Sequence, residues 1–355
     1  SSPVSKNFRI GNLFFGLILK VRIKNCSGSL GKIDRKIRLA FSEIRIQPQA
    51  DWGCDKWLST SPNLVKWQKM PYFKQTKQVD MYQKVALAIA FSPRMEALIA
   101  EARRLKGLFQ GELVLIHVGV KTPELEAKLD EILKRLCADL GKVKVIWKEG
   151  KPAKTILKTC EEEGVDLLVL GALKKEGLLT YYLGSVARKV IRKSPCSVLT
   201  LIDPKIETTR FSKVVINGTQ LEVTPKVIEK GLKFCQAENA SQVHILNEIK
   251  LYGLQMATAG EGSEDEVALT RRKLVQEEIR YVQEILDGLD QSGLKINIKV
   301  TAGKWAVELV RYCDSISADL LIMGDEHGYT FIDRLFPHDL EEILSEIPCN
   351  LLIIK

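Results

Sequence analysis

The chain has 355 residues, which is enough for two domains with their own hydrophobic cores, and 45% of the residues are hydrophobic. Lys and Arg outnumber Asp and Glu by 53 to 44, giving a net charge of +9, but residues 1–80 contain 15 of the basic residues and only 5 of the acidic ones. The remaining residues are close to neutral, so the basic pI does not indicate a nucleic-acid partner, and we expect none.

Cysteine usage and hydropathy favour a cytoplasmic protein. The eight cysteines are scattered, without a CxxC pair, as is typical of free buried thiols in a reducing compartment. We expect no transmembrane segment, because no apolar run approaches the ~20 residues that span a bilayer. The best candidate, LFFGLIL at residues 13–19, favours a hydrophobic strand or loosely ordered extension, with a membrane-surface or partner-binding segment as the alternative.

Residues 1–80 form a basic, aromatic-bearing extension of unknown role, which contains Trp52, Trp57 and Trp67. Met81 directly precedes the first regular strand and would make a natural start for the folded body. Two interpretations remain open: an extended reading frame before Met81, or a genuine extension that docks on the body or on a partner.

After residue 80, strands and helices are predicted to alternate. An apolar run over residues 84–92 predicts a buried strand, and Ser92-Pro93 predicts a helix with Ser92 as N-cap and Pro93 in the first helical position. Thr122-Pro123 predicts a second helix start in the same way. The later expected elements of this half are strands at 112–118, 142–147, 166–170 and 197–202, and helices at 151–163 and 185–193.

The second half repeats this order. Its expected strands cover residues 212–216, 242–246, 295–300, 319–323 and 350–354, and its expected helices cover 225–236, 267–286, 304–316 and 339–346. Short connections between alternating strands and helices predict a doubly wound parallel sheet in each half, with domains at 81–204 and 210–355.

The two halves are a duplication with a constant offset of 153. Six pairs share it, and VDLLVLG matches ADLLIMG around one of them. Upstream we align Ala90 with Asn217, an offset of 127, which places about 26 extra residues in the second copy, around residues 258–266. The pairs are Gly150 and Gly303, Cys160 and Cys313, Asp166 and Asp319, Gly171 and Gly324, Pro195 and Pro348, and Cys196 and Cys349.

The loop after the fourth strand of the first copy is the best candidate for binding chemistry. Gly171 permits a tight exit from the strand, and Gly184-Ser185 opens a helix whose free N–H groups and dipole favour phosphate. Lys174 adds positive charge. A plain glycine turn followed by a capped helix explains the same residues without a ligand.

The repeat and this spacing resemble the universal stress protein family, here as a tandem pair over residues 81–355. The resemblance implies two tandem five-stranded α/β domains of the adenine nucleotide alpha hydrolase-like type. ATP-binding members have Gly-x-x-Gly, nine residues, then Gly-Ser or Gly-Thr, and here Lys174 replaces the second Gly. The resemblance implies ATP, with Mg²⁺ accompanying it, as the ligand of the first copy. The implied contacts are Ala90, Phe91, Ser92, Val118, Gly171, Lys174, Gly184, Ser185 and Val186.

Both copies depart from the family pattern. In the first copy, Ala90 stands where members usually have the Asp that bonds the nucleoside, and Phe91, which would crowd or stack on the base, stands where Gly is usual. In the second copy Pro337-His338 replaces Gly-Ser, and a proline removes a donor N–H. Residues 217–219 (Asn-Gly-Thr) predict that the second copy better keeps the nucleoside end, while the first keeps the phosphate end.

Three functions follow from these patterns. A nucleotide-binding regulatory protein that acts through an unidentified protein partner is favoured, with a non-binding interaction scaffold as the alternative. An ATP hydrolase lacks an identifiable general base. The resemblance also implies pairing of the last strands, residues 197–202 and 350–354, as an internal pseudo-dimer, with a homodimer as a further option. His117 and His244 are interpreted as satisfied core histidines, and no metal site is expected.

Overall fold

The computed structural model describes residues 81–140, 143–174, 181–249, 264–325, 343–344 and 347–355. The extension of residues 1–80, most of the expected helix 339–346 and the insertion around 258–266 lie wholly or largely outside them. The first repeat contains β1 (Lys84–Ile89), α4 (Met95–Phe109), β2 (Glu112–Val118), α5 (Pro123–Leu136), a short 3₁₀ turn (Ala138–Leu140), β3 (Lys144–Lys148), α6 (Pro152–Glu163), β4 (Leu167–Gly171), β5 (Leu173–Lys174), β6 (Tyr181–Tyr182), α7 (Ser185–Lys193) and β7 (Ser197–Leu201).

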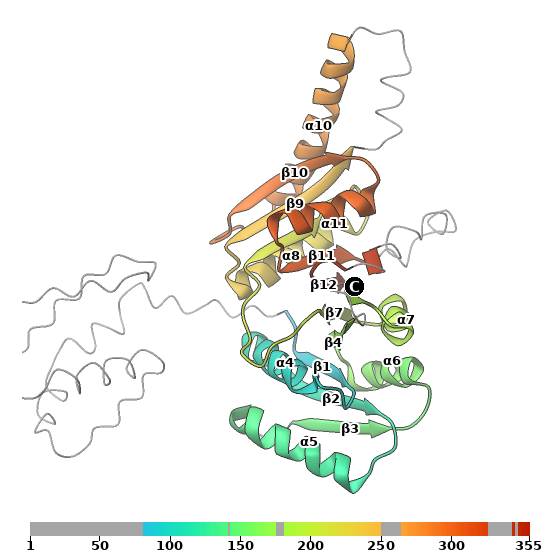
Figure 1. Cartoon of the computed structure of the whole chain (residues 1–355). Coiled ribbons are helices and arrows are strands. Elements are labelled where there is room, and N and C mark those ends of the chain that lie inside the picture. The colour runs from blue at the N-terminus through green and yellow to red at the C-terminus, as the bar shows by residue number, and fades with distance from the viewer. Residues whose placement is uncertain (1–80, 141–142, 175–180, 250–263, 326–342, 345–346) are drawn as a thin grey trace, which may run out of the picture. The chain divides into compact units, whose positions relative to one another are not determined.

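The second repeat follows the same plan, without a described counterpart of β5 and β6 (Figure 1). Its elements are β8 (Lys213–Asn217), α8 (Thr224–Glu238), β9 (Gln242–Ile249), α10 (Glu264–Asp287), β10 (Ile296–Ala302), α11 (Trp305–Ile316), β11 (Leu320–Gly324) and β12 (Asn350–Ile354).

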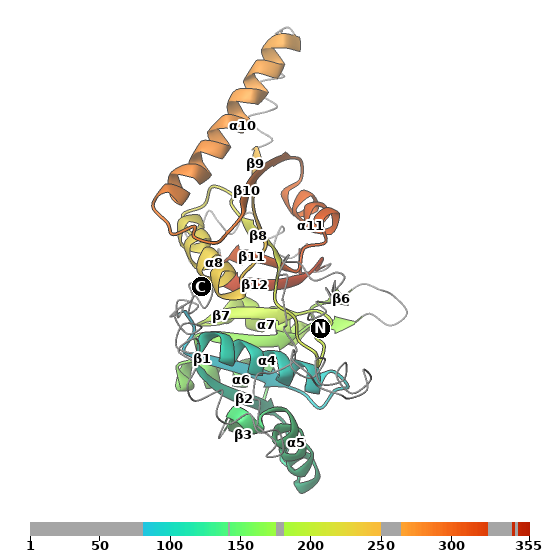
Figure 2. The same cartoon turned by 90° about the vertical axis from the view of Figure 1, so that its left-hand side faces the viewer.

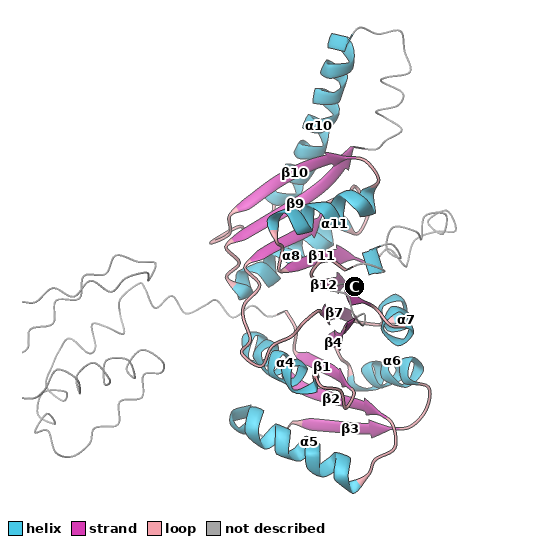
Figure 3. Ribbon diagram, in the orientation of Figure 1, coloured by secondary structure: helices cyan, strands magenta, loops and turns pink. Residues whose placement is uncertain are grey.

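The ten long strands form one sheet in the order β10-β9-β8-β11-β12-β7-β4-β1-β2-β3. Within each repeat the strands of this sheet pair in parallel, so the predicted doubly wound fold is confirmed. The short strands β5 and β6 form a separate antiparallel pair. Side chains alternate across the sheet and fill two cores: one lies under α4, α5, α8 and α10, and the other under α6, α7 and α11 (Figure 3).

Two of the residues matched by the offset of 153 have a structural role that explains their repetition. The Asp166 carboxylate accepts hydrogen bonds from the backbone N–H groups of Gln83 and Lys84, at 2.7 and 3.1 Å. In the second repeat, Asp319 accepts from Ser212 and Lys213, both at 2.8 Å. Each aspartate therefore ties the start of the fourth strand of its repeat to the start of the first.

The predicted alignment of Ala90 with Asn217 is wrong. Val85 is paired with Leu167 in one repeat, and Val214 is paired with Leu320 in the other, which gives an offset of 129. Helices α4 and α8 begin and end at this same offset, and both have a left-handed residue as C-cap. The correct counterpart of Ala90 is Thr219. A short valine-rich strand has too few distinctive residues to exclude an error of two residues in the sequence alignment of the two repeats.

The two repeats are joined by antiparallel pairing of β7 with β12, as the resemblance implied. Leu199 faces Leu352 at the centre of the ladder, and these two residues are themselves equivalent at the offset of 153. The pairing is therefore symmetric about this point, as in an isologous dimer interface, although one chain supplies both sides.

A buried ion cluster joins α4 to α8, which Figure 2 shows on the same side of the sheet. The Arg104 guanidinium donates two 2.8 Å bonds to the Glu238 carboxylate and two, at 2.6 and 3.0 Å, to Glu101. It also lies 5.3 Å from the centre of the Phe211 ring. Burial raises the pKa of Glu238, whose side chain is 0% exposed, and the attraction of Arg104 opposes that shift.

We predict that Arg104→Leu lowers the free energy of unfolding by about 3–5 kcal/mol, because it leaves the Glu238 carboxylate buried without its cation. Equilibrium unfolding in urea measures the loss. Arg103→Leu is the matched control: Arg103 pairs with Asp139 at the surface, so its loss should be under about 1 kcal/mol. Equal effects of the two variants would contradict a special role for the buried cluster.

Candidate nucleotide site

The candidate residues lie at the carboxyl ends of neighbouring strands. In the first repeat β1 has β2 on one side and β4 on the other, so the strand order reverses at β1. Open α/β sheets bind ligands at such a switch point. Ala90 and Phe91 follow β1, Val118 ends β2 and Gly171 ends β4, so the topology brings these predicted residues to one edge.

The helix after β1 begins later than predicted. Helix α4 starts at Met95, its N-cap is Arg94, and no side chain caps it. Ser92 is exposed and its carbonyl accepts from the Met95 N–H at 3.1 Å, so Ser92 and Pro93 lie in a turn before the helix. The predicted Ser92 N-cap is therefore wrong, because this turn places the first helical N–H groups beyond the reach expected for that side chain.

Arg94 is a residue of this edge that the sequence patterns did not single out. Its Nη2 donates to the Ala172 carbonyl at 2.5 Å, so the side chain crosses from the end of β1 to the exit of β4. The other terminal nitrogen, Nη1, is buried and has no hydrogen-bond partner in the described part of the chain. An arginine after a serine-proline pair matches no motif, so only its contact across the switch point distinguishes it from a surface cation.

An aromatic cluster occupies the ends of β1, β2 and β3. The Phe91 ring is stacked near Trp147, at 5.9 Å between ring centres, and meets the edge of His117 at 5.1 Å. The His117 Nδ1 lies 3.2 Å from the Ile89 carbonyl, as expected for a satisfied histidine. Phe91 therefore packs against neighbouring protein rings and is not a free platform at the edge.

The predicted helix start at Gly184-Ser185 is present. Helix α7 begins at Ser185, and Gly184 is its N-cap without a side-chain hydrogen bond. Ser185 and Val186 are exposed. The first N–H groups of α7 are thus left for solvent or an anion. The Lys174 side chain and residues 175–180 of the connecting loop lie outside the described residues.

Gly171 has a packing role. A Cβ there would lie 2.9 Å from Cδ1 of Leu98, a buried side chain on α4. A Cβ at Gly184 would lie 2.8 Å from Cδ1 of Leu173, but that side chain is exposed and can move aside. Gly324 in the second repeat is equally crowded by Val223 and Val227. Close approach of helix to strand therefore explains both strand-end glycines, whether or not a phosphate binds nearby.

The second repeat does not offer the expected nucleoside end. The Asn217 side chain is 4% exposed and accepts hydrogen bonds from the N–H and hydroxyl of Thr219, at 3.0 and 2.7 Å. Its oxygen is thus used within the turn. His327, Pro337 and His338 lie outside the described residues.

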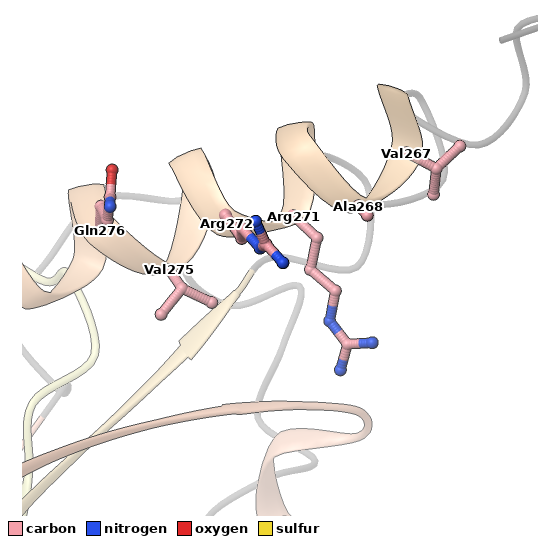
Figure 4. A pocket seen from close by; sticks show the side chains of 6 residues that line it. All are labelled: Val267, Ala268, Arg271, Arg272, Val275 and Gln276. Atoms are coloured by element: carbon pink, nitrogen blue, oxygen red, sulfur yellow. The ribbon is translucent and has the colours of Figure 1, made fainter. Parts of the chain in front are cut away.

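The other candidate features support no separate site. His244 is hydrogen bonded to Tyr312 and Gln242, as predicted for a core histidine. The described residues contain no His, Cys, Asp or Glu cluster suited to a metal, and none of the described helices is long and apolar enough to cross a membrane. Among the described residues, those that line a hollow along α10 all belong to that helix (Figure 4): Val267, Ala268, Arg271, Arg272, Val275 and Gln276.

Comparison with known proteins identifies the family. The model of the universal stress protein family matches residues 81–201 and 214–355. Universal stress protein MJ0577 of Methanocaldococcus jannaschii is 31% identical over 155 residues, covering 34% of this chain and 95% of the relative. Universal stress protein YxiE of Bacillus subtilis is 32% identical over 145 residues, covering 34% of this chain and 98% of the relative.

Solved structures share the tandem architecture. A functionally unknown protein from Pseudomonas aeruginosa has a TM-score of 0.56 at 15% identity, with 78% of this chain and 94% of that one covered. A universal stress protein from Archaeoglobus fulgidus has a TM-score of 0.50 at 13% identity, covering 77% of this chain and 96% of that one. At these identities the match supports the fold alone.

We predict that Gly171→Ala lowers the free energy of unfolding by about 1–3 kcal/mol, because the new methyl group overlaps Leu98. In Gly171→Ala/Leu98→Ala the methyl group has room, so the double variant should lose at least about 0.5 kcal/mol less than the sum of the single losses. Urea unfolding of the three variants gives this coupling.

Gly107→Ala is the control, since a Cβ there meets nothing within 4 Å and alanine favours the helix. Strict additivity of Gly171→Ala and Leu98→Ala would show that the glycine is not needed for this contact.

Proposed function

Because the chain belongs to the universal stress protein family, whose model covers both repeats, we propose that it is a regulatory protein that binds ATP or a related adenine nucleotide in its first repeat. The bound nucleotide would act through contacts with a protein partner. The observation that carries the proposal is the start of α7, where the exposed residues Ser185 and Val186 open a helix after a loop that begins at the switch point.

The charge of this region supports an anionic ligand. Helix α7 contains Arg188, Lys189, Arg192 and Lys193 and has no acidic residue. Arg188 Nε donates to the Leu183 carbonyl at 2.9 Å, which links the helix to the end of the preceding loop. Mg²⁺ would accompany ATP through the phosphates, since the described residues supply no carboxylate cluster for it.

A scaffold without a nucleotide is the second candidate. It is favoured by the packing role of Gly171 and by Ala90, which offers no carboxylate to a nucleoside. Mass spectrometry of molecules released from protein purified under native conditions separates the two candidates, because a co-purified adenine nucleotide would exclude the scaffold.

We predict that the full chain binds Mg-ATP in equilibrium dialysis and that Ser185→Asp weakens binding tenfold or more. A carboxylate in the first turn of α7 favours the helix itself but repels a phosphate at the same place. Thr122→Asp is the matched control: it adds the same charge at the N-cap of α5, where aspartate is an equally good cap. No binding by the unmodified protein at millimolar ATP would overturn the proposed function.

A further inference from the structure

Arg94 occupies a position where its charge does not benefit the helix. It is the N-cap of α4, which is the positive end of the helix dipole, and serine, threonine, asparagine and aspartate are preferred there. Its guanidinium makes no ion pair with the residues that the structure describes. What holds it is the single bond from Nη2 to the carbonyl of Ala172.

The second nitrogen of the guanidinium is what calls for an explanation. Nη1 is buried, and it has no hydrogen-bond partner among the residues that the structure describes. Leaving a charged donor without water and without a partner is costly, and native structures leave few such groups unsatisfied. A group that lies unsatisfied at a switch point therefore points to an acceptor that arrives with a ligand.

The fork shape of arginine defines that acceptor. A guanidinium offers parallel N–H groups that match the oxygens of a phosphate or carboxylate. The bond to Ala172 fixes the side chain at the start of the loop that ends at Gly184, so little rotamer freedom remains to be lost on binding. The Arg94 guanidinium is thus already positioned before a ligand binds. It lies at the same edge of the sheet as Ala90, which has no carboxylate.

We propose that Arg94 binds a phosphate group of the nucleotide through Nη1, so that the first repeat recognises phosphate at the end of β1 as well as at the start of α7. This inference rests on the proposed function of the same edge. It makes the ligand a polyphosphate-bearing nucleotide, with its charge contributing more to binding than its nucleoside.

The test compares three probes, ATP, adenosine and inorganic tripolyphosphate, on the full chain and on Arg94→Gln. Isothermal titration calorimetry at fixed ionic strength gives each dissociation constant. We expect Arg94→Gln to weaken the binding of ATP and of tripolyphosphate tenfold or more, and to change the dissociation constant of adenosine less than twofold. Arg94→Lys keeps the charge but loses the paired N–H groups of the guanidinium. Its dissociation constants for ATP and tripolyphosphate should therefore lie between those of the unmodified chain and those of Arg94→Gln.

Arg311→Gln is the control, since Arg311 is an exposed arginine on α11 that pairs with Glu308, and it should leave all three constants unchanged. Thermal unfolding of each variant verifies the fold. Equal weakening of ATP and adenosine by Arg94→Gln would overturn the proposal by showing that Arg94 only positions the loop, and unchanged ATP and tripolyphosphate binding would overturn it directly.

The outcomes for the unmodified chain keep the two proposals apart. Binding of tripolyphosphate that depends on Arg94, without binding of ATP, would support the anion site and reject the adenine nucleotide. If the unmodified chain binds neither ATP nor tripolyphosphate, both proposals are rejected. Binding of ATP that is insensitive to Arg94 would reject the present inference alone.

Discussion

The antiparallel pairing of β7 with β12 is the interaction on which the arrangement of the described body depends. Each repeat alone would have a last strand with an open row of N–H and C=O groups, which is an edge that invites pairing. The ladder centred on Leu199 and Leu352 closes both edges at once and extends the core across the junction. Because the ladder has two-fold symmetry, it also brings α4 beside α8, where the buried ion cluster forms.

Much of this fold could be predicted from the sequence because its signals are long and redundant. Five apolar strands per repeat, separated by helical stripes, leave few alternative topologies. The six pairs at one offset identify the duplication without any structure, and the two members of one pair, Asp166 and Asp319, have the same bonding role. The predicted helix starts at Thr122 and Ser185 were correct, because local capping chemistry and glycine determined them.

The candidate site was less predictable because its details depend on contacts between segments distant in sequence. The register of β8 against β1 is set by pairing with β4 and β11, so a two-residue error in aligning valine-rich strands has no local signal. Gly171 is a glycine because Leu98 lies against it, a fact invisible to a phosphate-loop motif. Arg94 acquires its significance only from Ala172, 78 residues further along the chain.

Placing both halves in one polypeptide has a consequence for how the protein can diverge. In a symmetric dimer of identical subunits each substitution appears twice, so the interface must accommodate the new residue at both equivalent positions. Here Arg104 and Glu238 have Lys233 and Phe109 as their counterparts at the offset of 129, and the salt bridge exists once. Fusion thus releases each half from the constraint of symmetry. One half is free to specialise in ligand chemistry while the other keeps the shared sheet intact.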